Sequence, residues 1–126
     1  MRAVVKSVLT AEEAEDLIKD SLNKSFKFSK NTPKSLEKIL NSILNIVDLK
    51  VQKESYWRIE KTQPFGHDWH LDTGNGNHML WCKYGGTVLL TEHGNGGYLK
   101  YRKNGVEELI KNREQFDLYF HSMPVN

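Results

Sequence analysis

Hydrophobic residues at helical spacing dominate the first part of the chain. Apolar side chains recur every three or four positions over residues 11–23, so one stripe can pack inward while the Glu/Lys face stays in water. That stripe consists of Ala14, Leu17, Ile18 and Leu22. Thr10 and Glu13 have the T-x-x-E spacing of a capping box, in which each side chain accepts a backbone N–H at the helix start. The pattern predicts a helix over residues 11–23, and the short apolar stretches 3–5 and 8–9 before it can form an edge strand.

A second helix is predicted after the polar segment 25–31. Thr32 and Pro33 mark its start, because proline at the first helical position lacks an N–H that would be unpaired there anyway. The apolar positions that follow again have the helical period. They are Leu36, Ile39, Leu40, Ile43, Leu44 and Val47.

Beyond residue 51 the pattern changes to short β-rich runs separated by glycine and asparagine. The Tyr84-Gly85-Gly86 segment is interpreted as a turn, and Asn104-Gly105 favours a two-residue hairpin turn. Two helices followed by a series of short strands predict an α+β fold, with the helices packed on one side of a β-sandwich or jelly roll. The strands are expected over residues 55–61, 68–72, 79–82, 87–91, 98–102, 106–110 and 115–121.

Length, charge and cysteine content limit the number of domains, the partners and the compartment that we expect for this chain. The chain has 126 residues, enough for one domain over residues 1–126. Its 18 Lys and Arg residues against 16 Asp and Glu residues give a formal charge of +2, too balanced for a chain whose main partner is nucleic acid. Cys82 has no second cysteine to pair with, which indicates a reducing compartment. The sequence lacks a signal-peptide core and any run of ~18 apolar residues, so we expect a cytoplasmic protein with no membrane partner.

Residues 66–74 form the segment that is densest in reactive side chains. His70 and Asp72 are two positions apart, so on a strand both side chains leave the same face. An imidazole and a carboxylate on one face are two of the three ligands of the facial triad that binds non-haem Fe(II). By composition alone, a chain with 5 histidines and 16 acidic residues contains roughly 0.6 such pairs. The pair by itself therefore does not separate a metal site from a solvated strand.

The order of segments around this pair changes the interpretation. The segments are VLTAEEAEDLI over residues 8–18, YWRIE over 56–60 leading into HLD over 70–72, TVLL over 87–90, GGYL over 96–99 and FDLYFHS over 116–122. In this order the chain resembles the Fe(II)/2-oxoglutarate-dependent dioxygenases, particularly their prolyl 4-hydroxylase-like branch. No single motif is strong, but the order and spacing of five are difficult to obtain from an unrelated sandwich.

This resemblance implies a double-stranded β-helix that couples decarboxylation of 2-oxoglutarate to hydroxylation of a substrate. His70 and Asp72 would be the catalytic metal ligands, and the distal ligand would be either His121 or a histidine beyond Asn126. The implied cofactors are Fe(II) and 2-oxoglutarate, with ascorbate as an optional third. The substrate would be a peptide or a small molecule, with peptidyl proline as the first candidate.

The resemblance is incomplete at the C-terminal end. Family members place an Arg or Lys about one strand after the distal histidine, where it pairs with the 2-oxoglutarate carboxylate. The chain ends before that position, and Lys100 and Arg102 on one face of the strand 98–102 are the candidate replacements. We therefore expect a domain that lacks its last strand or strands, and an open sheet edge of this kind can recruit a second copy.

A function of a different class stays open. A jelly-roll binding module without a competent metal centre, or an inactive oxygenase fragment, would have the same strand pattern. A cupin-like metal hydrolase or isomerase would need more histidines on the strands. The remaining histidines, His67, His78 and His93, are interpreted as solvated loop residues.

Overall fold

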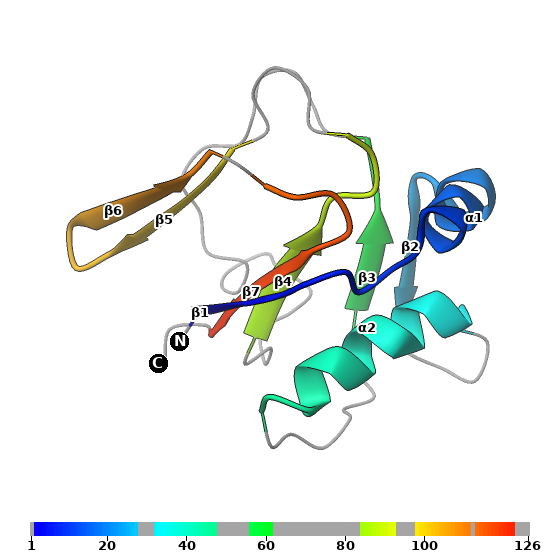
Figure 1. Cartoon of the computed structure of the whole chain (residues 1–126), viewed down its shortest axis with the longest axis horizontal. Coiled ribbons are helices and arrows are strands. Elements are labelled where there is room, and N and C mark those ends of the chain that lie inside the picture. The colour runs from blue at the N-terminus through cyan, green and yellow to red at the C-terminus, as the bar shows by residue number, and fades with distance from the viewer. Residues whose placement is uncertain are drawn as a thin grey trace.

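The computed structural model describes residues 2–27, 32–47, 56–61, 84–92, 98–111 and 113–122. These residues form two helices and seven strands (Figure 1). In chain order the elements are β1 (Arg2–Val5), α1 (Ala11–Ser21), β2 (Lys24–Lys27), α2 (Lys34–Leu44), β3 (Tyr56–Ile59), β4 (Tyr84–Val88), β5 (Leu99–Lys103), β6 (Val106–Ile110) and β7 (Leu118–Ser122).

The first helix begins as its capping box predicts. The Glu13 N–H donates to Thr10 Oγ1 at 3.1 Å, and the Thr10 N–H donates to Glu13 Oε1 at 2.8 Å. The helix ends at Ser21, two residues earlier than expected, because Asn23 adopts the left-handed conformation (φ 64°) and its N–H donates to Ile59 O at 2.7 Å. This contact with β3 starts the strand β2, which the sequence pattern did not predict.

The second helix also lies close to its expected position. Pro33 is the N-cap, with φ −53° and ψ 139°, so the helix starts one residue later than a proline at the first helical position would give. Leu36 and Ile39 are buried on its apolar stripe. Val47 follows the last turn and is buried as well.

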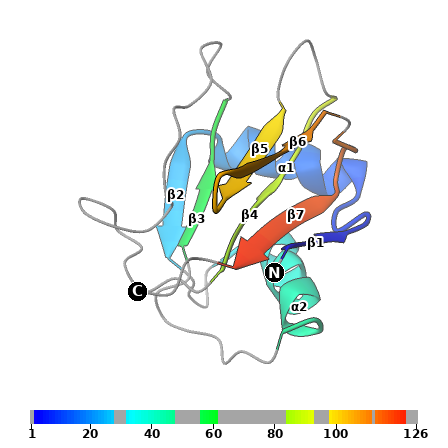
Figure 2. The same cartoon turned by 90° about the vertical axis from the view of Figure 1, so that its left-hand side faces the viewer.

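β7 is the middle strand of the largest sheet. This sheet has the order β1-β7-β4, and both pairings are antiparallel, with Arg2 opposite His121 in one and Gly85 opposite His121 in the other. The pairs β2-β3 and β5-β6 form two further antiparallel ribbons. In Figure 1 the β5-β6 hairpin and α1 lie at opposite ends of the molecule, with the other strands between them, and Figure 2 shows the hairpin in front of those strands.

The strand β4 corrects one prediction. Gly85 and Gly86 lie inside this strand and do not form a turn. A Cβ on Gly86 would lie 2.8 Å from Tyr119 O and 2.9 Å from Phe120 Cβ, distances that real Cβ atoms do not adopt. Glycine at position 86 therefore permits the close approach of β4 to β7.

The Asn104-Gly105 hairpin is confirmed. The two residues connect β5 to β6 and have φ values of 52° and 77°. Positive φ at both central positions is the requirement of the type I′ turn, whose twist matches that of the flanking strands. The Cα register, with Lys103 opposite Val106, fits this two-residue loop.

One buried cluster joins both helices to the sheets. Leu17 of α1, Leu36 and Ile39 of α2, and Leu118 and Phe120 of β7 are each at most 3% exposed. The cluster is completed by Val8, Leu9, Val47 and Ile59. Burial of each large apolar side chain contributes about 1.5–3 kcal/mol, so this shared cluster is a main source of stability.

The jelly roll stays a prediction. The strands expected over residues 68–72 and 79–82 lie outside the described residues, and the described strands form one three-stranded sheet and two antiparallel two-stranded pairs. These elements agree with an α+β chain in which the helices precede most of the strands.

Candidate functional site

The strand β7 brings its last two residues out of the core. Leu118, Tyr119 and Phe120 are buried, whereas His121 and Ser122 are half-buried. His121 stands between Arg2 of β1 and Gly85 of β4 in the sheet register. A side chain at this position combines a rigid backbone with access to solvent, which suits a functional residue.

Besides β4, the strands β1, β5 and β6 contribute to the surroundings of His121. The Tyr101 ring of β5 meets the imidazole edge to face, with centroids 5.2 Å apart and planes at 65°. The Arg2 guanidinium of β1 lies over the Tyr101 ring, 5.0 Å from its centroid. Arg2 also forms an ion pair with Glu108 of β6. We call Arg2, Tyr101, Glu108 and His121 the His121 cluster.

One ring nitrogen of the imidazole faces a backbone carbonyl. His121 Nδ1 lies 3.2 Å from Ser122 O. With the proton on Nδ1, the ring donates to this carbonyl oxygen, and the lone pair of the neutral imidazole is then on Nε2. Histidines that bind metals commonly donate their second ring N–H to a carbonyl or carboxylate in this way. The donor geometry of His121 therefore fits a metal ligand that binds through Nε2.

The other two predicted ligands cannot be placed beside it. His70 and Asp72 lie outside the described residues, as do Cys82 and the loop histidines His67, His78 and His93. Among the described residues no group of three His, Cys, Asp or Glu side chains could hold a metal ion. The described part of the chain thus contains one member of the predicted triad.

Lys100 and Arg102 lie on the exposed face of β5. Residues Leu99 to Lys103 alternate between half-buried and exposed up to Arg102, so Lys100 and Arg102 point away from the face that holds Tyr101. Arg102 Nη1 is 4.0 Å from a carboxylate oxygen of Glu107. This placement puts both cations on the opposite side of the hairpin from His121. Their assignment as co-substrate anchors stays a prediction, because His70 and Asp72 lie outside the described residues.

Asp117 is a buried carboxylate that the sequence analysis did not single out. Its side chain is 3% exposed, Oδ2 accepts from Lys6 Nζ at 2.9 Å, and Oδ1 accepts from the Ser7 N–H at 2.8 Å. Burial alone raises the pKa of Asp117, but the hydrogen bonds from Lys6 and Ser7 and the charge of Lys6 outweigh it and leave the pKa below its ordinary value. In the sequence, a single acidic residue within the apolar run FDLYF could have indicated a buried carboxylate. Its role is to tie β7 to the segment after β1.

Arg113 is a second half-buried charge near the same strand. Its Nη2 donates to Thr87 Oγ1 at 2.9 Å, and its guanidinium lies 5.6 Å from the Tyr119 ring centroid. Burial lowers the pKa of Arg113. These contacts join the segment before β7 to β4 and Tyr119, and they account for the arginine as a structural residue.

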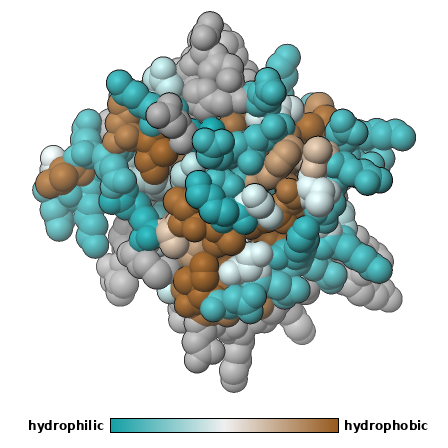
Figure 3. Space-filling view, viewed as in Figure 1, coloured by the Kyte–Doolittle hydropathy of each residue, from teal (hydrophilic) through white to brown (hydrophobic). Residues whose placement is uncertain are grey.

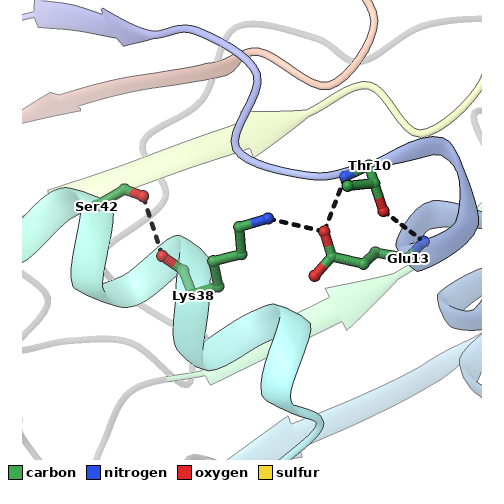
Figure 4. A network of polar contacts seen from close by, with 4 residues as sticks. All are labelled: Thr10, Glu13, Lys38 and Ser42. Atoms are coloured by element: carbon green, nitrogen blue, oxygen red, sulfur yellow. Dashed lines mark hydrogen bonds and ion pairs between the residues drawn. The ribbon is translucent and has the colours of Figure 1, made fainter.

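An acidic hollow lies between the two helices. It has a volume of about 260 Å³ and is lined by Glu13, Asp16, Leu17, Asp20, Ser21, Pro33, Lys34 and Ser35. Glu13 is already engaged, since Lys38 Nζ donates to its Oε1 at 2.8 Å beside the Thr10 contacts, and Ser42 donates to Lys38 O (Figure 4). The hydrogen bond from Lys38, followed by that from the Thr10 backbone, lowers the pKa of Glu13. This network explains Glu13 as a link between α1 and α2.

The space-filling view shows how hydrophobic and hydrophilic residues are distributed on one face of the molecule. Hydrophobic surface gathers in the middle of the face shown in Figure 3, and hydrophilic residues surround it. Among the large hydrophobic residues in the described part of the chain, Val106 beside the hairpin turn is the most exposed, at 72%. The hairpin is otherwise mainly polar, with Lys100, Arg102 and Glu107 all exposed.

Comparison with models of known protein families, with curated proteins and with solved structures finds no match to this chain. None of the described helices is long and apolar enough to span a membrane.

Proposed function

We propose that this chain is a non-haem Fe(II) dioxygenase of the 2-oxoglutarate-dependent, prolyl 4-hydroxylase-like type. The main support is the ordered series of five segments in the sequence, in which the HLD of residues 70–72 precedes the strand β7 that contains His121. The structure adds one supporting observation. With the proton on Nδ1, the contact of His121 with Ser122 O leaves the lone pair on Nε2, one of the two ring nitrogens through which a histidine binds a metal ion.

The residues have separate roles in this proposal. His70, Asp72 and His121 hold the metal, and the central position of β7 in its sheet keeps His121 in place. Bound Fe(II), with 2-oxoglutarate and O₂ as co-substrates, supplies the oxidising chemistry for hydroxylation of a C–H bond. The protein binds and orients a peptide or small-molecule substrate, with peptidyl proline as the first to test. Ascorbate is a further additive for the assay.

Ligand-dependent melting tests the metal site first. A ligand at 100 times its Kd stabilises the folded state by about 2.7 kcal/mol. For a chain of this length that is a rise in Tm of roughly 10 °C. We expect such a rise with Mn(II) and 2-oxoglutarate together, and its loss in His70→Ala, Asp72→Ala and His121→Ala. His93→Ala, another histidine substitution, is the matched control and should keep the rise.

Turnover is then measured as succinate formed from 2-oxoglutarate with Fe(II) and O₂. Formation of succinate that depends on His70 and Asp72 supports the dioxygenase. A rise in KM for 2-oxoglutarate in Lys100→Ala or Arg102→Ala would identify the carboxylate anchor. Absence of both the melting shift and succinate, with His70→Ala indistinguishable from the unmodified protein, overturns the proposal in favour of a non-catalytic binding module.

A further inference from the structure

The His121 cluster joins four strands that are far apart in the sequence. Arg2 belongs to β1, Tyr101 to β5, Glu108 to β6 and His121 to β7. We propose that Tyr101, held by Arg2 and Glu108, is a positioning residue that sets the orientation and the tautomer of the His121 imidazole. The consequence for metal binding rests on the proposed function, whereas the effect on the ring itself does not.

The contact with Ser122 O does not by itself fix the orientation of the imidazole. Rotation about the χ2 angle of histidine is broad and roughly two-fold, and a half-turn exchanges the positions of the two ring nitrogens with those of ring carbons. The contact from Nδ1 to Ser122 O, at 3.2 Å, is long enough to constrain the ring only weakly. The Tyr101 ring, 5.2 Å away and inclined at 65°, blocks the space that a turning imidazole would sweep. By limiting rotation of the imidazole, Tyr101 keeps Nδ1 facing Ser122 O, and the carbonyl acceptor then favours the proton on Nδ1.

Tyr101 is in turn held from two sides. The Arg2 guanidinium lies 5.0 Å from the centre of its ring, a cation–π distance. The strand register places Arg2 opposite His121 in the sheet and Tyr101 opposite Glu108 in the hairpin. The Arg2–Glu108 ion pair is therefore a second contact between the hairpin and the sheet, beside the contact of Tyr101 with His121. The hairpin therefore docks on β1 and β7 through this cluster.

Stability alone does not account for the ion pair. The side chains of Arg2 and Glu108 are 43% and 50% exposed, and pairs as exposed as this contribute little to folding. Their arrangement is better explained by geometry, because the pair holds the guanidinium over Tyr101 and so keeps the tyrosine against His121. A substitution of Glu108 should then alter the orientation of the His121 imidazole without unfolding the protein.

The ring of His121 is observed directly by long-range ¹H–¹⁵N NMR of the metal-free full chain at about pH 8, well above the ordinary histidine pKa of about 6.5. Loss of signals in His121→Ala assigns them. We expect the Nδ1–H tautomer in the unmodified protein and a mixture containing the Nε2–H tautomer in Tyr101→Ala. Tyr101→Phe, which keeps the ring, should restore the original spectrum. Glu108→Gln should change it in the same direction by less, and Glu107→Gln, on the opposite face of β6, should not.

Mn(II) titration of the same variants measures the consequence for the metal. Loss of a residue that orients a ligand typically weakens metal binding by about 10–100-fold, so Tyr101→Ala should raise the Kd for Mn(II) at least about tenfold. If His121→Ala leaves this Kd unchanged, the assignment of His121 as a ligand fails, and the NMR result still decides the positioning role.

The NMR outcomes are separable. An unchanged His121 spectrum in both Tyr101→Ala and Glu108→Gln overturns the inference. A change in Tyr101→Ala alone supports Tyr101 and removes Glu108 from the role. If Tyr101→Ala does not fold, the surface variant Glu108→Gln against Glu107→Gln becomes the deciding pair, and equal spectra for those two overturn the inference.

Discussion

Replacement of Asp117 by asparagine tests the buried carboxylate that ties β7 to the turn after β1. The carboxylate accepts one hydrogen bond from the Ser7 N–H at 2.8 Å and another from Lys6 Nζ at 2.9 Å. Asparagine has nearly the same shape but a single acceptor oxygen, and its amide nitrogen only donates. One of the two hydrogen bonds is therefore lost in Asp117→Asn, and a donor is placed against a donor.

The size of the effect follows from the charge and burial of the group. Hydrogen bonds to charged groups contribute about 1.5–3 kcal/mol each, so we expect the free energy of unfolding to fall by about that amount. The pKa of Asp117 is lower in the folded state than in the unfolded state. Stabilisation by such a group is complete above the unfolded pKa, near 4, and is lost as the pH falls through the folded pKa. The difference in free energy of unfolding between the unmodified protein and Asp117→Asn should thus have its full size at neutral pH and become smaller below about pH 4.

Urea unfolding followed by tryptophan fluorescence, repeated from neutral to acidic pH, measures this difference. Lys6→Gln is the comparison, because the Lys6 side chain is 70% exposed and its ion pair is screened by solvent. It should destabilise less than Asp117→Asn. A loss below about 0.5 kcal/mol in Asp117→Asn, smaller than one net hydrogen bond, would refute the reasoning, as would a loss that stays constant into acid.

Three further substitutions test other parts of the fold. Gly86→Ala forces a Cβ to within 3 Å of Tyr119 O and Phe120 Cβ and should lower the free energy of unfolding by about 1–3 kcal/mol in urea; unchanged stability would contradict the close approach of β4 to β7. Thr10→Ala removes the acceptor for the Glu13 N–H and should cost about 1 kcal/mol, with Thr10→Ser near the original value; equal loss in both would contradict the cap. Phe120→Ala, at a side chain that is 1% exposed, should cost about 3–5 kcal/mol, and a Tm close to that of the unmodified protein would place Phe120 outside the core.

The sequence by itself determined the elements that depend on neighbours within a few residues. The α1 cap needs Thr10 and Glu13 three positions apart, and the hairpin turn needs residues that tolerate positive φ at 104 and 105. The alternation that places Lys100 and Arg102 on one face of β5 is equally local. These features were predictable because the residues that interact lie within one turn of a helix or within one hairpin.

The tertiary structure decided whatever depends on contacts between distant segments. Gly86 was interpreted as a turn residue. Glycine is needed there because the backbone of β7, more than thirty positions away in the sequence, leaves no room for a Cβ. The sequence placed His121 at the end of an apolar strand, while its neighbours Arg2 and Tyr101 come from strands that only the docked hairpin brings together. Residue patterns encode which face of a strand is apolar, but not which strand will pack against it, because that choice is made by the packing of the whole core.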